Sequence, residues 1–268
     1  MNLDFRNRTL IMGILNITPD SFFDGGKFYV LDQAIKRADE MLNEGADIID
    51  IGGESTRPGA DLISIQEEMD RVLPIFSKLK GFPIPLSIDT YKHQVAEEAC
   101  KLGATIINDI SGLQFDPEIV NVAKKYDTYI IIMHMKGHPR DMQKNPQYGN
   151  VISEIISFLR KQSTFARGSG VSESRIIVDP GIGFGKTLEH NILILKEIEK
   201  FKEIGFPILV GHSRKSMIGA LLNHQPPDDR LYGTMAISAY LLLKRIEVLR
   251  VHDVRPHFEM REVIEALL

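Results

Sequence analysis

Polar and ionisable residues follow several apolar runs of this sequence, and their types indicate what they could bind. Three of them, Asp89, Asn108 and Asp179, offer carboxylate or amide oxygens that accept hydrogen bonds. A carboxylate that faces a ring N–H and its exocyclic amine makes a bidentate pair like the one it makes with arginine. These three side chains therefore suit a flat heterocycle with several N–H donors.

A second set of residues near the same run ends carries positive charge, and it consists of Arg57, Lys215, Arg250 and His252. Basic side chains gathered on one rim suit an anionic group such as a phosphate. Aromatic rings that could stack on a heterocycle come from Phe22, Phe23 and Phe184. The sequence therefore predicts a ligand with a donor-rich ring held at depth and an anionic group held at the rim.

Each polar residue taken alone has a simpler interpretation, because an aspartate after a strand commonly caps the next helix. The set also includes Asn16 and the segment 54–57, so most of the predicted strand ends carry a polar group. A barrel would bring all of these ends to one mouth. That many polar groups around one mouth predict a binding site rather than a series of helix caps.

The segment 176–187 shows the strand-end pattern clearly, because a β-branched apolar run stops at Asp179 and glycines follow. Two known phosphate motifs are excluded here. A P-loop that ends in Gly-Lys-Thr would need glycine at position 180, where Pro180 stands, and a dinucleotide fingerprint would need glycine or alanine in place of Lys186.

Apolar runs predict eight strands, at 9–15, 47–51, 85–88, 105–107, 129–133, 176–178, 207–210 and 246–251. Helical patterns separate them, at 31–45, 64–79, 93–102, 117–126, 150–165, 188–202, 217–222, 233–243 and 257–268. Alternating strands and helices require parallel strands with right-handed crossovers. Eight such units predict an α/β fold, the (β/α)8 TIM barrel, as a single domain over residues 1–268; an open doubly wound sheet is the alternative.

Composition limits the class of protein. A length of 268 residues with 43% hydrophobic residues suits one large core, and a net charge of -4 argues against nucleic acid as a partner. The single cysteine, Cys100, excludes an internal disulfide and fits a reducing compartment. The charged start of the chain is not a signal peptide, and no apolar run reaches membrane-spanning length. These features predict a cytoplasmic protein without a membrane partner.

In order along the chain, the sequence resembles the dihydropteroate synthase family. The matching stretches are 15–22, 52–59, 88–90, 107–110, 133–137 with 142–143, 179–186, 213–216 and 250–254. They cover nearly the whole chain in the order of the family. Two departures are Phe23, where the family's first loop has a smaller polar residue, and His212, which precedes the Ser-Arg-Lys stretch.

The resemblance implies condensation of 6-hydroxymethyl-7,8-dihydropterin pyrophosphate with p-aminobenzoate, which gives 7,8-dihydropteroate and pyrophosphate in folate biosynthesis. It implies a transferase that sulfonamides target, Mg²⁺ as cofactor and a homodimer. The implied catalytic residues are Asp89, Asn108, Asp179, Lys215, Arg250 and His252.

The resemblance also assigns binding roles. Around the pterin it places Asp89, Asn108, Asp179 and Lys215, with Ile110, Met133, Phe184 and Gly211 beside them. Around the pyrophosphate it places Thr56, Arg57, Arg250 and His252, and it gives Asn16 the contact to Mg²⁺. Two loops, at about 17–28 and 54–64, would close with Ser216 around the aminobenzoate.

The chemistry agrees with these residue types. Pyrophosphate can leave ahead of attack, because the conjugated ring shares the positive charge that develops on the methylene carbon. The protein must then neutralise charge on the leaving group, which cationic side chains and Mg²⁺ can do. The attacking aniline is neutral at pH 7, so neither a strong base nor a covalent nucleophile is needed.

Two other functions stay open from the sequence: a pterin-dependent methyltransferase and a barrel that binds pterin without turnover. Simpler interpretations also apply to single residues. Asp50 lies inside a strand and is interpreted as structural, and Lys186 as a side chain that faces solvent. His134 and His138 have metal-like spacing, but Gly137 prevents the helix that would align them.

Overall fold

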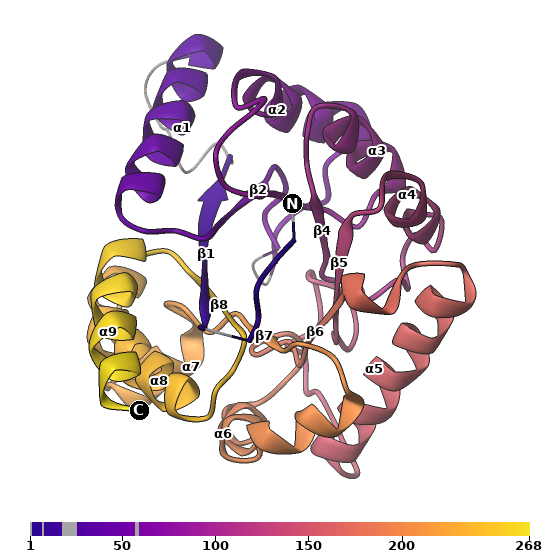
Figure 1. Cartoon of the computed structure of the whole chain (residues 1–268). Coiled ribbons are helices and arrows are strands. Elements are labelled where there is room, and N and C mark those ends of the chain that lie inside the picture. Colours follow the sequence, from indigo (N-terminus) through magenta and orange to yellow (C-terminus); the bar gives the residue numbers. More distant parts are fainter. Residues whose placement is uncertain (1, 7, 18–25, 57–58) are drawn as a thin grey trace.

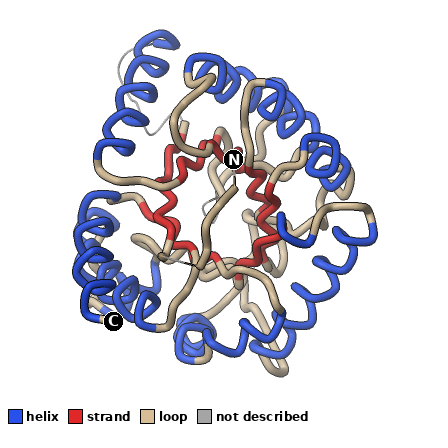
Figure 2. The backbone as a smooth tube through the Cα atoms, viewed as in Figure 1, coloured by secondary structure: helices blue, strands red, loops and turns tan. Residues whose placement is uncertain are grey.

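The computed structural model describes residues 2–6, 8–17, 26–56 and 59–268. Eight parallel strands form a ring, and the helices surround it on the outside (Figure 1, Figure 2). Neighbours in the sheet follow the order β6-β5-β4-β3-β2-β1-β8-β7, so each strand lies beside the next one in the chain. The predicted (β/α)8 barrel is confirmed, and the alternative of an open doubly wound sheet is wrong, because that fold reverses its strand order.

The strands are short, and most begin within one or two residues of the predicted positions. They are β1 (Leu10–Asn16), β2 (Ile48–Gly52), β3 (Leu86–Asp89), β4 (Ile106–Asp109), β5 (Tyr129–Met133), β6 (Ile176–Asp179), β7 (Leu209–Val210) and β8 (Val248–Val251). Asn16, Asp89 and Asp179 are therefore the last residues of their strands. The strand predicted at 207–210 has only two ladder residues, because Pro207 begins it and Gly211 follows it.

The helices are α1 (Gly26–Asn43), α2 (Ile65–Lys78), α3 (His93–Lys101), α4 (Ile119–Tyr126), α5 (Val151–Gly168), α6 (Leu188–Lys196), α7 (Ser216–Leu221), α8 (Leu231–Leu243) and α9 (Val254–Leu267). The helix predicted at 188–202 ends early, and a 3₁₀ helix, Ile198–Ile204, continues it. The start of α6 is fixed by a reciprocal cap between Thr187 and His190. In the part of the chain that the structure describes, no helix could cross a membrane.

Alternation along the strands divides the apolar side chains into two layers. The larger layer packs against the helices, and the smaller one fills the barrel with Leu10, Met12, Ile48, Ile106, Tyr129, Ile131, Ile177, Leu209 and Val248. The N-terminal segment covers one end of this interior, since Leu3 and Phe5 pack against it and Leu3 N donates to Tyr129 Oη at 2.9 Å. The opposite end, where the strands finish, carries the polar residues.

One edge of the ring is joined more weakly than the rest. Ladders join the other neighbouring strands, including β7 to β8 through Leu209 and Val210. Between β6 and β7, the described backbone has a single isolated bridge, Val178 to Ile208, in which Val178 N donates to Pro207 O at 2.9 Å. The barrel is thus closed along this edge by one rung.

Candidate active site

The strand register brings polar residues of the first four strands into one row. Asn16 pairs with Gly52, Gly52 with Asp89, and Asp89 with Asn108. A Cβ atom at Gly52 would lie 3.4 Å from Asp89 Oδ2 and 3.7 Å from Asn16 Oδ1. The glycine therefore leaves space between an amide and a carboxylate at the mouth of the barrel.

Next to this row, Arg250 joins the buried Asp50 to Asp89, whose side chain is 9% exposed. Its Nε donates to Asp50 Oδ2 at 2.6 Å and its Nη2 donates to Asp89 Oδ2 at 2.7 Å. Asn108 Nδ2 donates to the same oxygen of Asp50 at 3.0 Å. Asp50, which the sequence analysis set aside as structural, has no exposed surface and connects two of the predicted site residues. The missed signal is alternation, because Asp50 lies two residues before Gly52 and shares its face.

The last predicted pterin residues meet on the other side of the mouth. Asp179 Oδ1 accepts from Gly181 N at 2.7 Å, and the Lys215 ammonium donates to Ile182 O and lies 4.4 Å from the centre of the Phe184 ring. A Cβ atom at Gly211 would lie 4.0 Å from Asp179 Oδ2 and 3.8 Å from Arg250 Cβ. A side chain at Gly211 would therefore enter the space between Asp179 and Arg250.

An apolar wall borders these polar groups. Ile110 and Met133 are buried in one cluster with Met135 and Met142, and Phe184 packs against it. The predicted neighbours of the ring, Ile110, Met133 and Phe184, thus share one surface. A flat apolar wall beside acceptors and a lysine suits a planar, polar-edged ring.

Burial shifts the protonation of the charged groups toward neutrality. It raises the pKa of Asp89 to about 7, although Arg250 acts in the opposite direction. It also raises the pKa of Asp179 and lowers the pKa of Lys215 to about 7. A ligand with complementary donors and acceptors would stabilise the charged forms of these groups, so such a ligand gains from binding here.

Known proteins have related sequences and the same fold. The family model for pterin binding enzymes matches residues 12–252. The dihydropteroate synthase of Synechocystis sp. is 47% identical over 98% of this chain and 92% of its own length. The chain belongs to the dihydropteroate synthase family of pterin binding enzymes.

Other relatives agree with this family. The dihydropteroate synthase of Bacillus subtilis is 44% identical over 99% of this chain and 91% of its own length. A crystal structure of the Clostridium difficile dihydropteroate synthase in the presence of pteroic acid has a TM-score of 0.93, with 44% identity, and covers 99% of this chain and 98% of that chain. The structure of the Xanthomonas albilineans dihydropteroate synthase with 4-aminobenzoic acid has a TM-score of 0.92 and 36% identity. The match covers 99% of this chain and 94% of that chain. The predicted family is confirmed.

Of the residues that the family resemblance gave to the pyrophosphate, the structure describes Thr56, Arg250 and His252. His252 Nδ1 lies 2.9 Å from Ser213 Oγ, and its backbone N donates to the same oxygen at 3.2 Å. Thr56 is half-buried after β2, and Ser216 is exposed at the start of α7. Arg57 lies outside the described residues, as do Phe22 and Phe23, so their predicted contacts stay predictions.

The interpretation of Lys186 as a side chain that faces solvent is wrong. Lys186 is 3% exposed, and its Nζ donates to the backbone oxygens of Gly181 and Phe184 at 2.9 Å each and of His134 at 3.2 Å. Its Nζ also lies 3.0 Å from His134 Nδ1. The two residues join the loop after β5 to the loop after β6, and both loops border the apolar wall.

In this structure each ring of the His134 and His138 pair has another neighbour. His134 meets Lys186, and burial lowers the pKa of His134 to about 2. His138 stacks on Phe115, with ring centres 4.6 Å apart. Both histidines therefore serve packing and hydrogen bonding between loops.

A buried ionic group at the base of the 54–64 loop was also missed. Lys92 Nζ lies 2.5 Å from Glu54 Oε2 and 2.6 Å from Glu68 Oε2, and it donates to Ile63 O at 2.9 Å. Tyr91 Oη donates to Glu54 Oε1 at 2.9 Å. Glu54 and Ile63 are near the two ends of the loop, so Lys92 fixes its base, and Glu54 is not open to a ligand.

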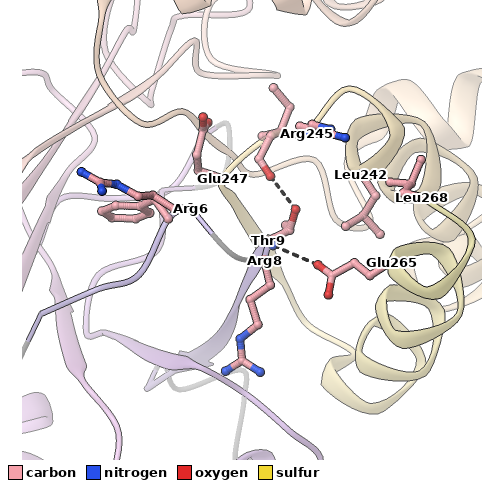
Figure 3. A pocket seen from close by; sticks show the side chains of 10 residues that line it. Arg6, Arg8, Thr9, Leu242, Arg245, Glu247, Glu265 and Leu268 are labelled. Atoms are coloured by element: carbon pink, nitrogen blue, oxygen red, sulfur yellow. Dashed lines mark hydrogen bonds between the residues drawn. The ribbon is translucent and has the colours of Figure 1, made fainter.

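A cavity of about 230 Å³ lies at the other end of the barrel (Figure 3). It is lined by residues before β1 and β8 and on α8 and α9, among them Arg6, Thr9, Arg245, Glu247 and Glu265. Thr9 Oγ1 donates to Ile246 O at 2.8 Å, and Thr9 N donates to Glu265 Oε1 at 3.1 Å. Its lining includes no predicted site residue, so it is separate from the site at the strand ends.

Proposed function

We propose that this protein condenses 6-hydroxymethyl-7,8-dihydropterin pyrophosphate with p-aminobenzoate, giving 7,8-dihydropteroate and pyrophosphate. The observation that carries the proposal is the layer of Asp89, Asn108, Asp179, Lys215 and Arg250 at one barrel mouth, in a chain of the dihydropteroate synthase family. Acceptors, a lysine and a guanidinium there match a ring with N–H donors that carries an anionic group.

The pterin edge would bond to the carboxylate of Asp179 and the amide of Asn108, and Lys215 would donate to an acceptor on the ring. The ring faces would contact Ile110, Met133 and Phe184, which share one apolar surface. Gly211 has no side chain to occupy this space. These contacts orient the methylene carbon toward the rim.

The leaving pyrophosphate would contact Arg250, His252, Thr56 and Arg57 at that rim. Preorganised positive charge stabilises the negative charge that develops as the bond to carbon breaks. The amine of the aminobenzoate then attacks the carbon and releases its proton to solvent, so no residue needs to form a covalent bond. The aminobenzoate site would form from Ser216 and the loops at about 17–28 and 54–64.

Mg²⁺ fits the residues present if the substrate supplies most of its ligands. Among the described residues no cluster of three acidic, histidine or cysteine side chains could hold a metal alone. Mg²⁺ prefers oxygen ligands and commonly binds through one or two protein oxygens together with substrate phosphates and water. The Asn16 amide oxygen, beside the space that Gly52 leaves, would hold it, and the ion would neutralise charge on the pyrophosphate.

We further propose that the whole chain acts as one domain, in the cytoplasm, as a homodimer. The support for the dimer is α8, whose residues are largely apolar on all sides although Tyr232 is 86% exposed and Leu243 57% exposed. Leu221 on the adjacent α7 is also exposed. Light scattering should give twice the chain mass, and Tyr232→Glu with Leu243→Glu should give the single mass.

The activity is tested by mixing the protein with the pterin pyrophosphate, p-aminobenzoate and Mg²⁺ and measuring dihydropteroate by mass spectrometry. Product with the wild-type protein, and none with Asp179→Asn, supports the proposal. Pterin binding without product would instead identify a non-catalytic binder. Transfer of a methyl group from a methylated pterin would identify the methyltransferase, which needs no pyrophosphate.

A further inference from the structure

Two buried histidines share one serine hydroxyl behind the candidate site. His212 Nε2 lies 2.7 Å from Ser238 Oγ, and His257 Nε2 lies 3.0 Å from the same oxygen. His212 follows β7, Ser238 is on α8 and His257 is on α9, and none of the three is exposed. The proposed reaction gives them no chemical step.

At the α9 end of this group, the contacts of His257 show which of its ring nitrogens carries the proton. Its Nδ1 lies 2.5 Å from the backbone oxygen of Asp253, which can only accept, so Nδ1 carries a proton. Burial lowers the pKa of His257, so the ring is neutral and its Nε2 is an acceptor. The Ser238 hydroxyl must therefore donate to His257 and accept from His212.

At the β7 end, the contacts of His212 independently give the same direction of donation, from His212 to Ser238. His212 Nε2 also lies 3.3 Å from Thr234 O, which can only accept, so Nε2 is the protonated nitrogen. Burial lowers the pKa of His212 to about 3, so this ring is neutral too. Within the described residues its Nδ1 has no hydrogen-bond partner, so the assignment of the proton rests on the contacts of Nε2.

The hydrogen bonds thus run in one direction from His212 through Ser238 and His257 to Asp253. Both ends of this chain belong to loops of the candidate site. The residue after His212 is Ser213, whose Oγ contacts His252, and His212 O accepts from Lys215 N at 3.3 Å. At the other end, the side chain of Asp253 binds Arg214 at 2.6 and 3.0 Å.

The backbone of the first loop needs such support. Arg214 has a φ of 56°, in the left-handed region that a residue with a side chain seldom adopts. A conformation of this kind persists when neighbouring contacts determine it. His212 makes a buried contact two residues before this point, which fixes the start of the turn.

We infer that His212 is a positioning residue, which acts through Ser238 and His257 to hold the loop of Ser213 and Lys215 against the loop of His252. His212 is one of the two departures from the family pattern, so the family resemblance does not predict this arrangement. Its effect on pyrophosphate rests on the proposed function, whereas the proton order does not.

The proton order is tested by nuclear magnetic resonance on the full chain with ¹⁵N-labelled histidine. We expect the Nε2–H tautomer for His212 and the Nδ1–H tautomer for His257 at pH 7, assigned with His212→Gln and His257→Gln. The opposite tautomer at either residue, or a charged ring, would overturn the inference even if the protein proves to be inactive.

The positioning role is tested by the affinity for inorganic pyrophosphate with Mg²⁺, measured by calorimetry. Ser238→Ala and His212→Leu should each weaken binding about fivefold, the scale of one lost hydrogen bond. His212→Gln should stay within about twofold of wild type, because its Nε2 donor lies the same number of bonds from Cβ. Ser163→Ala is the matched control, since Ser163 is buried on α5 and its hydroxyl has no partner among the described residues.

Equal weakening by glutamine and leucine at position 212, or unchanged affinity in Ser238→Ala, would overturn the positioning role. A wild-type protein that binds no pyrophosphate would overturn the proposed function instead. The tautomers alone would then decide whether the directional hydrogen bonds exist.

Discussion

Arg250 on β8 bonds Asp50 on β2, although β1 lies between these two strands in the sheet. The Nε to Oδ2 distance is 2.6 Å, and the same guanidinium bonds Asp89 on β3. One cation therefore compensates the buried carboxylate of Asp50 and the largely covered carboxylate of Asp89, and it ties together three strands of the barrel. Arg250 therefore stabilises the barrel in addition to making the proposed contact with pyrophosphate.

Replacing this cation should destabilise the fold. Arg250→Met leaves the carboxylates of Asp50 and Asp89 without a compensating cation and should lower the free energy of unfolding by about 3 kcal/mol. Adding Asp50→Asn should restore part of the loss. Urea denaturation measures both changes, with Arg167→Met, at an exposed surface pair with Glu173, as the control that should change little. A double variant that is less stable than Arg250→Met would contradict the assigned pairing.

Asp179 should decide pterin affinity. Asp179→Asn keeps the shape but presents amide donors to the N–H donors of the ring, so the loss should be ~2–5 kcal/mol in binding free energy. Calorimetry with the bare pterin measures it, and thermal melting reports whether the fold survives. Asp127→Asn, at an exposed residue paired with Arg175, should bind as wild type does. Wild-type affinity in Asp179→Asn would remove this carboxylate from the pocket.

The buried ammonium of Lys186 should matter for stability although it never meets solvent. Lys186→Met removes the donor from three backbone oxygens, and unsatisfied buried acceptors should cost at least about 2 kcal/mol of unfolding free energy. Lys136→Met is the control, because Lys136 is on the loop after β5 and is exposed. Equal stability of the two variants in urea would show that the three carbonyl contacts contribute nothing.

Lys215 should make stability depend on pH in the ligand-free protein. Burial lowers its pKa from 10.5 to about 7, so below pH 7 the folded protein holds this charge at a cost in free energy. Between about pH 7 and 10 the folded state releases this proton before the unfolded state does, so the free energy of unfolding rises with pH. Wild type should therefore gain stability relative to Lys215→Met from pH 7 to 9 in urea denaturation. A difference that stays constant over this range would contradict the lowered pKa.

The strand ends were predictable because apolar runs in this chain stop abruptly. Asn108 and Asp179 end runs of isoleucine and valine, and Asp89 ends the mixed run 85–88, so their meeting at one mouth needed only the barrel topology. The position of Asp50 at the site was harder to predict from the sequence. Asp50 lies within a strand that is apolar on both faces, so only its spacing of two residues from Gly52 indicates that it shares the face of the site.

Other contacts depend on residues far apart in the chain. Lys186 reaches the carbonyl of His134, 52 positions earlier, and no local pattern predicts that partner. The ring contacts of His212 and His257 depend on α8 and α9 packing side by side outside the barrel. Short-range patterns therefore predicted the elements and their ends, while the partners of buried polar side chains required the tertiary fold.

The single rung between β6 and β7 gives the ligand a mechanical role. Asp179 ends β6 and Lys215 follows β7, so a pterin that bonds to both would cross this edge and act as a further rung. The empty barrel should then open most readily as a slit along the line from Val178 to Ile208. Occupancy of the pocket should slow amide hydrogen exchange in these two strands more than in the six that are already joined by ladders.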